Sequence, residues 1–279
     1  AKRFYSIQMR EISINSPAKI NLYLRVKDKR DDGYHNIDTS FQCIDIYDYM
    51  NFKYIESGIK INSEESYFSD EDNTIYKSAK ILQGFSKKAS GVEISIKKNI
   101  PVGAGLGGGS SNAASTLVAL NKLWGLDLNI NVLMEIGSSI GADVPFFVNG
   151  KNAVGDGIGD ILKETSAITE NLLVINPKIH NSTKEMFKLL EVWKGKNKFD
   201  SLNQQNHFWN VFIENNPKIE EFYNQIAEDY EINLSGSGSS MFIKYKDRDE
   251  IDNVIKKIPT NWRLFFCKPL QYSPICYIK

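Results

Sequence analysis

The sequence predicts an α+β protein with two lobes, and two observations support this prediction. In the first half of the 279-residue chain, long segments alternate apolar and polar residues, as half-buried strands do. In the second half, short strands are mixed with segments whose apolar residues recur at helical spacing. Strands and helices that gather in two such clusters are typical of α+β proteins. We therefore expect a first lobe of residues 1–170 and a second lobe of residues 171–279.

The first lobe is expected to begin with two long strands. They are "EISINSPAKINLYLRV", residues 11–26, and "TSFQCIDIYDYMNFKYI", residues 39–55. A helix follows near residues 74–85, and "VEISIKKNIP", residues 92–101, is the next strand because apolar residues alternate along it. Beyond it, alanine, valine and leucine recur at helical spacing up to Gly125, which ends the helix. A glycine-rich segment therefore joins a strand to a helix.

The second lobe is expected to begin with the strand "NLLVIN", residues 171–176. Ser182 then caps a helix that buries Met186, Leu189 and Leu190 on one face. The remaining elements are a helix with Pro217 in its first turn, a helix with Ile251, Val254, Ile255 and Ile258 on its buried face, and the strand "WRLFFCK". This lobe therefore combines a small sheet with several helices.

The composition favours a soluble, cytoplasmic protein with no nucleic-acid or membrane partner. No stretch is long and apolar enough to span a bilayer, and "AKRFYSIQMR" lacks the apolar core of a signal peptide. Lysine plus arginine balance aspartate plus glutamate at 34 each, so no overall field attracts polyanions. Cys43, Cys267 and Cys276 lack metal-ligand spacing and are expected to be buried reduced thiols. Recognition of an anionic ligand must therefore be local.

Five glycines lie among residues 103–109 of the segment "VGAGLGGGSSNAAS". Each glycine costs conformational entropy on folding, so this cluster indicates backbone in unusual dihedrals or in close contact with a ligand. A flexible linker is the alternative, but linkers rarely stand between a strand and a helix. At such a junction the loop amides and the first N–H groups of the helix converge at the positive end of the helix dipole. The segment therefore predicts an anion site, and a polyphosphate is the usual ligand.

Other phosphate-binding motifs fit this segment less well. A Walker loop requires Lys and then Ser or Thr after the last glycine, but Gly109 and Ser110 stand there. Gly103, Gly105 and Gly108 match G-x-G-x-x-G, yet "LDLNINVLMEIGSSIG" predicts a second helix where the dinucleotide-binding fold requires a strand. No H-R-D or D-F-G segment of a protein kinase follows.

Two charged residues stand in apolar surroundings. Lys19 lies in the strand segment "SPAKINLYL", where a lysine must extend to solvent or meet a negative partner. Asp143 precedes Pro145 in "GADVPFFV", as the N-cap of a short helix would. For each residue alone, extension to solvent or helix capping is the simpler interpretation. Together they suggest an ion pair at the edge of the phosphate site, and this contact is our hypothesis.

Taken whole, "PVGAGLGGGSSNAAS" resembles the P-x-G-x-G-L-G-S/G-S-S motif of the GHMP kinases, the superfamily of galactokinase, homoserine kinase and mevalonate kinase. In that superfamily the loop surrounds the nucleotide phosphates at a helix N-terminus. The resemblance implies the two-lobed GHMP kinase fold, with a nucleotide-binding N-terminal lobe and a C-terminal α+β lobe. The ATP-binding residues that it implies are Pro101, Val102, Gly103, Ala104, Gly105, Leu106, Gly107, Gly108, Gly109, Ser110 and Ser111.

Five segments resemble, in order and spacing, the 4-diphosphocytidyl-2-C-methyl-D-erythritol kinase family. They are "SPAKINLYLRV", "RDDGYHNIDTSFQCID", the glycine-rich loop, "GADVPFFV" and "LSGSGSSMF". The resemblance implies transfer of the ATP γ-phosphate to the 2-hydroxyl of a methylerythritol linked to cytidine diphosphate, a step of the non-mevalonate isoprenoid pathway. It implies Lys19 and Asp143 as the catalytic pair, with Asp143 accepting the proton of the hydroxyl.

The same resemblance implies a set of substrate-binding residues. They are Asn21, Tyr34, His35, Phe187, Gly236, Ser237 and Gly238. Tyr34 would stack on cytosine and His35 would contact the edge of the base. Phe187 is placed on the other face of the base by counting from Pro177, and helix core is its alternative role. The segment "GSGSS" corresponds to a third superfamily motif, for which a turn between strands is the alternative.

Magnesium is expected to be carried by ATP, with no certain protein ligand. Ser110 or Ser111 would contact the phosphates or the water shell of Mg²⁺, and helix capping is the alternative role of both.

Two other functions remain open at this point. One is a different GHMP kinase, such as homoserine or mevalonate kinase, which lacks the "DGYH" segment; the other is a nucleotide-binding regulator or dinucleotide-binding protein without catalysis. The sequence leaves the oligomeric state undetermined.

Overall fold

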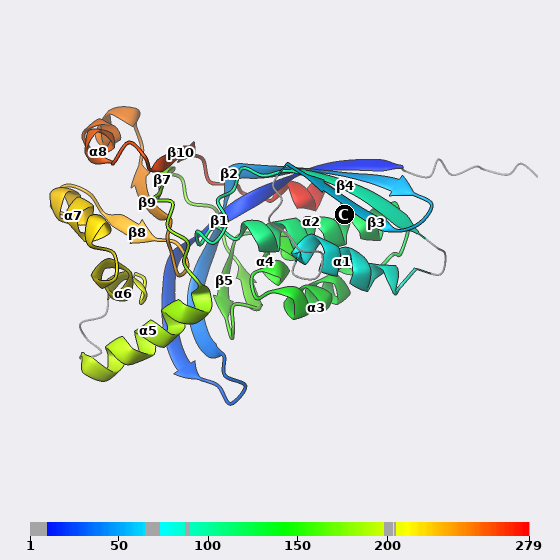
Figure 1. Cartoon of the computed structure of the whole chain (residues 1–279), viewed down its shortest axis with the longest axis horizontal. Helices are drawn as coiled ribbons and strands as arrows, with labels where there is room; N and C mark the ends of the chain where they lie inside the picture. The colour runs from blue at the N-terminus through cyan, green and yellow to red at the C-terminus, as the bar shows by residue number, and fades with distance from the viewer. Residues whose placement is uncertain (1–9, 65–72, 87–89, 198–202, 204, 279) are drawn as a thin grey trace, which may run out of the picture.

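The computed structural model describes residues 10–64, 73–86, 90–197, 203 and 205–278. Residues 1–9, on which the expected lack of a signal peptide rests, lie outside the described residues. A six-stranded sheet and a four-stranded sheet, both packed against helices, confirm the α+β class (Figure 1). In the described ranges, no helix is both long enough and apolar enough to cross a membrane.

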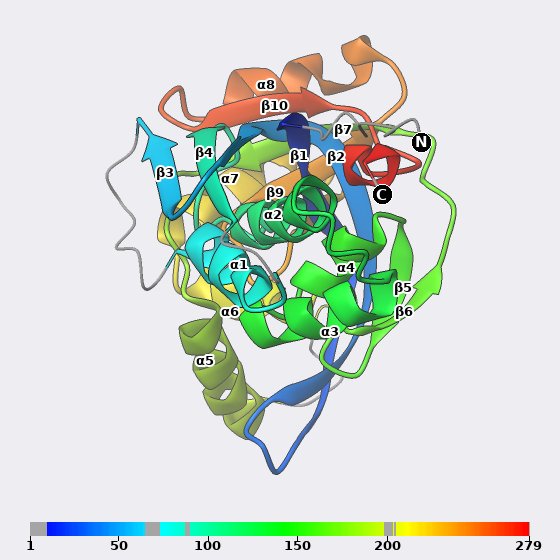
Figure 2. The same ribbon diagram turned by 90° about the vertical axis from the view of Figure 1, so that its right-hand side faces the viewer.

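The first sheet is organised around a long antiparallel ribbon. Strands β1 (Glu11–Lys29) and β2 (His35–Ile55) pair along nearly their whole length, and β2 also pairs with β4 (Gly91–Lys97) and β5 (Ala153–Asp156). The short strands β3 (Ile59–Ser63) and β6 (Ile161–Glu164), which we did not predict, extend the sheet at its two edges. The tip of the ribbon projects beyond the sheet and lies beside helix α5 (Figures 1 and 2).

Four helices cover one face of this sheet (Figure 1). They are α1 (Thr74–Gln83), α2 (Gly108–Leu123), α3 (Ile130–Ile140) and α4 (Val144–Asn149). Helix α2 is buried along most of its length because alanine, serine and threonine let it contact the sheet and the other three helices at once. Its start, which follows β4 and the glycine-rich loop, is therefore held rigidly.

The second sheet has the order β10-β7-β9-β8 and is antiparallel throughout. Its strands are β7 (Asn171–Asn176), β8 (Ile232–Leu234), β9 (Met241–Tyr245) and β10 (Arg263–Cys267). Helices α5 (Thr183–Lys196), α6 (Trp209–Glu214), α7 (Pro217–Ile226) and α8 (Asp252–Lys257) contribute to its hydrophobic core. Ser182 caps α5 and Pro217 begins α7, as predicted.

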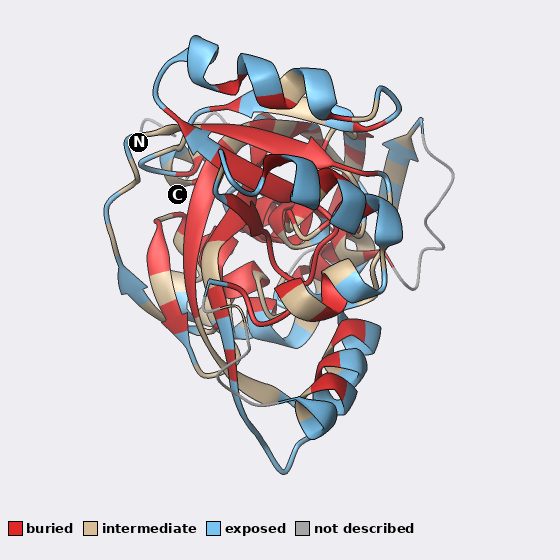
Figure 3. Ribbon diagram, turned by 90° about the vertical axis from the view of Figure 1, so that its left-hand side faces the viewer, coloured by how far each residue is buried: buried red, intermediate tan, exposed pale blue. Residues whose placement is uncertain are grey.

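Two details of these helices differ from the prediction. The buried face of α5 is Met186, Leu190 and Trp193, at spacings of four and three, whereas Leu189 is 38% exposed. Figure 3 shows that α5 carries both buried and exposed positions. Leu189 is adjacent to Leu190 and therefore points about 100° away from it around the helix. The helix expected over Ile251–Ile258 is a 3₁₀ turn, Arg248–Ile251, followed by the short helix α8.

After β10 the chain returns to the first sheet. A short 3₁₀ helix, Pro274–Tyr277, places Ile275 in the core of the first lobe, and the Ser273 amide donates to the Gly150 carbonyl at 2.9 Å. The division into residues 1–170 and 171–279 stays a prediction, and this C-terminal segment contacts the first lobe.

All three cysteines are free thiols, as expected. Cys43 and Cys267 are buried, and burial raises the pKa of both thiols. Cys276 is only half-buried because it follows Ile275, the residue that the 3₁₀ helix Pro274–Tyr277 turns into the core, which corrects the expectation for this residue.

Candidate active site

A cavity of about 970 Å³ is lined by residues of the β1–β2 ribbon, the glycine-rich loop, the starts of α1, α2 and α4, and α5. Its size falls at the upper end of the usual range for small-molecule sites. The predicted site residues that line it are Lys19, Asn21, Tyr34, His35, Pro101, Val102, Gly103, Ala104, Gly105, Gly107, Gly108, Gly109, Ser110, Asp143, Phe187, Gly236 and Ser237. Leu106, Ser111 and Gly238 are not among the lining residues.

The glycine-rich loop directs its carbonyl groups toward the protein. The carbonyls of Gly103, Ala104, Gly105 and Leu106 accept hydrogen bonds from Asn181 N, Ser240 N, Ser235 Oγ and Lys19 N, at 3.2, 3.0, 2.8 and 3.0 Å respectively. In contrast, the amides of residues 103–110 donate to no acceptor within the part of the chain that the structure describes. Backbone amides are nearly always paired in folded proteins, so this row of donors calls for an acceptor from outside the chain. An anionic ligand at the helix N-terminus would supply it.

Two glycines of the loop are required by their surroundings. Gly105 has φ of +75°, and a Cβ there would lie 2.1 Å from the Ser235 carbonyl oxygen. Gly107 has φ of +70°, and a Cβ there would lie 3.1 Å from Lys19 Cε. Between them, the Leu106 side chain is buried in the core and does not line the cavity. The loop is thus anchored by one apolar side chain while its glycine backbone faces the cavity.

The start of α2 differs from the expected capping arrangement. The helix begins at Gly108 with Gly107 as N-cap, so neither Ser110 nor Ser111 caps it. Ser111 is fully buried, and its Oγ lies 2.8 Å from Ser16 Oγ. Only Ser110 lines the cavity. Of the two serines predicted to contact phosphate or metal-bound water, Ser110 thus lines the cavity and Ser111 lies behind its wall.

Lys19 is held in the cavity wall by the irregular pairing of β1. Register shifts between Pro17 and Ala18 and between Asn21 and Tyr23 flank it, and such bulges redirect side chains. Its side chain is 4% exposed, so extension to solvent is wrong for this lysine. The ammonium donates to Asn21 Oδ1 at 2.6 Å and lies 3.3 Å from Asp143 Oδ2, which is the contact that we hypothesised.

Asp143 occupies the N-cap position of α4, but its side chain makes no capping hydrogen bond. The carboxylate instead turns toward Lys19 and stays 30% exposed, so it is reachable from the cavity. The ion pair prevails over the cap because a lysine in this apolar setting requires a counter-charge. Asp143 therefore joins one buried cation to the open cavity.

Asn21 is fixed by a chain of hydrogen bonds. Its Nδ2 donates to Thr39 Oγ1 at 2.7 Å, and Thr39 Oγ1 donates to the Tyr23 carbonyl at 2.7 Å. This arrangement directs the Asn21 carbonyl oxygen at Lys19, so Asn21 orients the lysine as well as lining the cavity.

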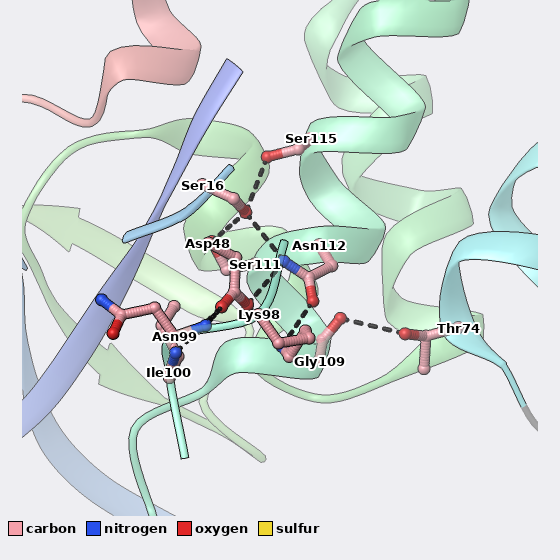
Figure 4. A network of polar contacts seen from close by, with 10 residues as sticks. All are labelled: Ser16, Asp48, Thr74, Lys98, Asn99, Ile100, Gly109, Ser111, Asn112 and Ser115. Atoms are coloured by element: carbon pink, nitrogen blue, oxygen red, sulfur yellow. Dashed lines mark hydrogen bonds and ion pairs between the residues drawn. The ribbon is translucent and has the colours of Figure 1, made fainter. Parts of the chain in front are cut away.

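A polar network that the sequence analysis missed supports the start of α2 (Figure 4). Asp48 on β2 is fully buried; its Oδ1 accepts from the amides of Asn99 and Ile100 at 2.7 and 2.9 Å, and its Oδ2 accepts from Asn112 Nδ2 at 3.0 Å. The Lys98 ammonium pairs with the same Oδ2 and donates to Asn112 Oδ1 at 2.9 Å. Lys98 also lines the cavity. The network thus connects β2, the end of β4 and α2 at the anion site.

The far end of the cavity is aromatic. Tyr34 is 59% exposed at the tip of the ribbon, and the His35 ring stacks on Phe187 of α5, with centroids 4.8 Å apart and ring planes 12° apart. Phe187 also meets Phe208 edge to face at 4.9 Å. Phe187 is therefore a cavity residue as well as part of the helix packing. One face of Phe187 carries His35, which sequence reasoning did not anticipate.

The third predicted motif contacts the glycine-rich loop. Gly236 and Ser237 line the cavity, and Ser237 Oγ lies 3.0 Å from Thr183 Oγ1. Gly238 packs instead against Phe212 and Leu234, where a Cβ would lie 3.3 and 3.1 Å from their side chains. The turn is thus both a connection between strands and one wall of the cavity.

The lining is positively charged overall. Five lysines line it against three carboxylates, the lysines being Lys19, Lys29, Lys98, Lys184 and Lys188 and the carboxylates Asp32, Asp143 and Glu191. In a chain with equal numbers of basic and acidic residues, this local excess favours a polyanionic ligand. The described residues contain no cluster of three or more histidine, cysteine, aspartate or glutamate side chains able to hold a metal ion.

Comparison with known proteins gives concordant results. The model of the GHMP kinases N terminal domain matches residues 73–151. A 4-diphosphocytidyl-2-C-methyl-D-erythritol kinase of Francisella philomiragia is 38% identical over 92% of this chain and 96% of its own length. The enzyme of the same name from Ruthia magnifica is 39% identical over 93% of this chain and 95% of its own length.

Solved structures show the same fold. A crystal structure of 4-(cytidine 5'-diphospho)-2C-methyl-D-erythritol kinase matches with a TM-score of 0.77 and 26% identity, over 92% of this chain and 99% of that one. A homoserine kinase from Cytophaga hutchinsonii matches with a TM-score of 0.71 and 15% identity, over 97% and 98%. At 15% identity the second likeness concerns the fold alone.

Proposed function

This chain belongs to the 4-diphosphocytidyl-2-C-methyl-D-erythritol kinase family, and on that premise we propose that it phosphorylates the 2-hydroxyl of 4-diphosphocytidyl-2-C-methyl-D-erythritol with ATP, a step of the non-mevalonate isoprenoid pathway. The substrate is a small molecule with a cytidine diphosphate group. The protein is a GHMP kinase that uses ATP as phosphate donor.

One observation carries the proposal: a single cavity joins the loop amides, which have no acceptor among the described residues, to the aromatic end at Tyr34, His35 and Phe187. The loop supports binding of the ATP phosphates, and the aromatic end supports binding of a flat base. The Lys19–Asp143 pair also lines this cavity. ATP phosphates at the loop, with an acceptor whose base lies at the aromatic end and whose methylerythritol hydroxyl reaches the Lys19–Asp143 pair, fit this arrangement.

The proposed chemistry follows from what each group can do. Phosphoryl transfer passes through a loose transition state, so positioning and charge neutralisation supply most of the acceleration. The loop amides and the positive end of the α2 dipole neutralise the phosphates. Asp143 accepts the proton of the acceptor hydroxyl, and Lys19 orients its carboxylate and stabilises the developing charge. Asn21 keeps the Lys19 ammonium directed at Asp143.

The lining also fits Mg²⁺ that is carried by ATP. Magnesium is usually held by substrate phosphates, water and one or two carboxylates rather than by a full protein cage. Asp143 and Ser110 supply oxygen donors in the cavity that would contact the metal or its water shell. When bound, the metal neutralises phosphate charge.

A substrate panel tests the proposal. ADP release is measured with ATP and 4-diphosphocytidyl-2-C-methyl-D-erythritol, homoserine or mevalonate as acceptor. We expect turnover with the cytidyl substrate, in the range of roughly 1–100 per second that is typical of kinases. Turnover with homoserine or mevalonate instead would indicate another GHMP kinase activity, and ATP binding without turnover on any acceptor would favour a nucleotide-binding regulator.

A further inference from the structure

We propose that Glu191 is a positioning residue that sets base specificity: it fixes the proton of His35 on Nε2, so that Nδ1 accepts a hydrogen bond from the amino group of cytosine. This inference rests on the proposed function, because it assumes that the base lies at the aromatic end of the cavity.

Three elements converge on the Glu191 carboxylate. His35 begins β2 and is the cross-strand partner of Lys29 on β1, so the two side chains emerge together from the ribbon. His35 Nε2 lies 3.1 Å from Glu191 Oε1, and Lys29 Nζ donates to the same oxygen at 2.7 Å. Glu191 lies on α5, one turn beyond Phe187. The ribbon and the helix are therefore joined through one carboxylate oxygen.

The charge of Glu191 determines which atom carries the proton. The hydrogen bond from Lys29 holds the pKa of the Glu191 carboxyl below its usual range, so this group is ionised in neutral solution. An ionised carboxylate only accepts hydrogen bonds. The imidazole nitrogen that faces it, Nε2, is therefore the one that bears hydrogen, and in the neutral ring Nδ1 is left as the acceptor.

The His35 ring is held in place and its Nδ1 is available. Stacking on Phe187 fixes the ring plane, and the side chain is only 10% exposed. Nδ1 has no hydrogen-bond partner in the described ranges, where every buried side-chain polar atom has one, so this nitrogen is accessible from the cavity. A base that is coplanar with the His35 ring lies parallel to the Phe187 ring, and its edge then faces Nδ1.

This arrangement distinguishes the two pyrimidines. Cytosine presents an amino donor where uracil presents a carbonyl acceptor. The amino group of cytosine donates a hydrogen bond to Nδ1, whereas the carbonyl oxygen of uracil would place a second acceptor against Nδ1 and form no hydrogen bond. To donate to uracil, His35 would need its proton on Nδ1. Nε2 would then be an unprotonated acceptor that faces the Glu191 carboxylate, which is also an acceptor. Glu191 therefore disfavours uracil through His35 without touching the base.

The first experiment measures kcat/KM for the cytidyl substrate and for its uridyl analogue, with ATP saturating. In Glu191→Leu the cytidyl-to-uridyl ratio should fall about 3- to 10-fold, the scale of one hydrogen bond, through KM of the cytidyl substrate. Glu191→Gln keeps an acceptor oxygen and should keep most of the ratio. Glu164→Leu, which removes a similarly exposed ion pair with Lys151, is the matched control and should leave the ratio unchanged.

An unchanged ratio in Glu191→Leu overturns the inference, and so does an equal fall in the Leu and Gln variants. A wild-type enzyme that phosphorylates neither nucleotide contradicts the proposed function instead.

The second experiment needs no substrate. It records ¹⁵N NMR spectra of the imidazoles, of which the chain has three, and uses the His35→Asn variant for assignment. A proton on Nε2 of His35 supports the inference, and a proton on Nδ1 overturns it.

Discussion

Replacing Asp48 by asparagine should strongly destabilise the fold. The Asp48 carboxylate is fully buried and balances the Lys98 ammonium, whose side chain is 5% exposed. In Asp48→Asn, the amide oxygen can still accept from the Asn99 and Ile100 amides, but the new NH₂ group faces the Lys98 ammonium and Asn112 Nδ2, both donors. Leaving a buried charge uncompensated costs about 3–5 kcal/mol of unfolding free energy.

Replacing Lys98, the partner of Asp48, tests whether the uncompensated charge causes the instability. Lys98→Met leaves Asp48 with three neutral donors and should cost less than Asp48→Asn. When both partners are replaced, the uncompensated charge is gone, so Asp48→Asn/Lys98→Met should be more stable than Asp48→Asn alone. Equilibrium unfolding in urea measures all three variants. Glu164→Gln, which breaks an exposed pair with Lys151, should cost about 1 kcal/mol or less.

Two results would refute this account. The first is a loss in Asp48→Asn no larger than in the exposed control. The second is a double variant whose loss equals the sum of the two single losses, because the partners would then act independently. Since the network supports the first turn of α2, we also expect a higher KM for ATP in the Asp48→Asn variant wherever it is still folded.

Four further predictions concern single residues. Gly109→Leu should raise KM for ATP about tenfold or more without lowering the melting temperature, because a Cβ there meets only Thr74 Oγ1, at 3.9 Å, and the side chain would displace a phosphate from charge-assisted hydrogen bonds. Asp143→Asn should lower kcat by ~10²–10⁴-fold while both KM values change little, as expected for a lost general base. Tyr34→Ala should weaken binding of the cytidyl substrate by about 1–3 kcal/mol and leave KM for ATP and the melting temperature unchanged, since the ring is exposed. Burial lowers the pKa of His207 from 6.5, so the unfolding free energy should fall as pH drops through about 6.5, and His207→Gln should flatten this dependence in urea titrations.

The glycine-rich loop and the Lys19–Asp143 contact could be predicted from sequence because each violates a strong local rule. Five glycines among residues 103–109 are costly unless backbone conformation or a ligand requires them. A lysine in an apolar strand and an aspartate in an apolar helix start each lack an obvious partner, and pairing them resolves both. The contact distance of 3.3 Å bears out this pairing, whereas the catalytic roles of the two residues stay proposals.

The Asp48–Lys98 ion pair could have been predicted from the alternation of buried and exposed residues along the strands. From Ile44 to Phe52 of β2 the buried positions are even-numbered, and Asp48 stands between Ile46 and Met50 in that series. In β4, Ile94 and Ile96 are buried, and Lys98 is the next even position. A charged residue in the inward phase of a strand requires a partner. The two opposite charges could therefore have been paired before the structure was known.

Other parts of the site carried no such signal. Glu191 is an exposed residue of a surface helix, and only the tertiary approach of the ribbon to α5 brings it to His35. Helix capping, the alternative role that we gave to Ser110 and Ser111, is wrong because Gly107, in the left-handed region, is the N-cap of α2 one turn earlier. Side-chain partners that depend on long-range packing are not specified by local pattern.

The return of the chain to the first sheet has a consequence for biosynthesis. Ile275 completes a core that also contains Ile12 and Ile14, so the two ends of the described chain must both be present before that core closes. A nascent chain that has emerged only as far as β7 leaves this apolar surface open, which exposes it to aggregation during synthesis. Because so many contacts join residues distant in sequence, the chain should fold slowly after release from the ribosome rather than lobe by lobe upon it.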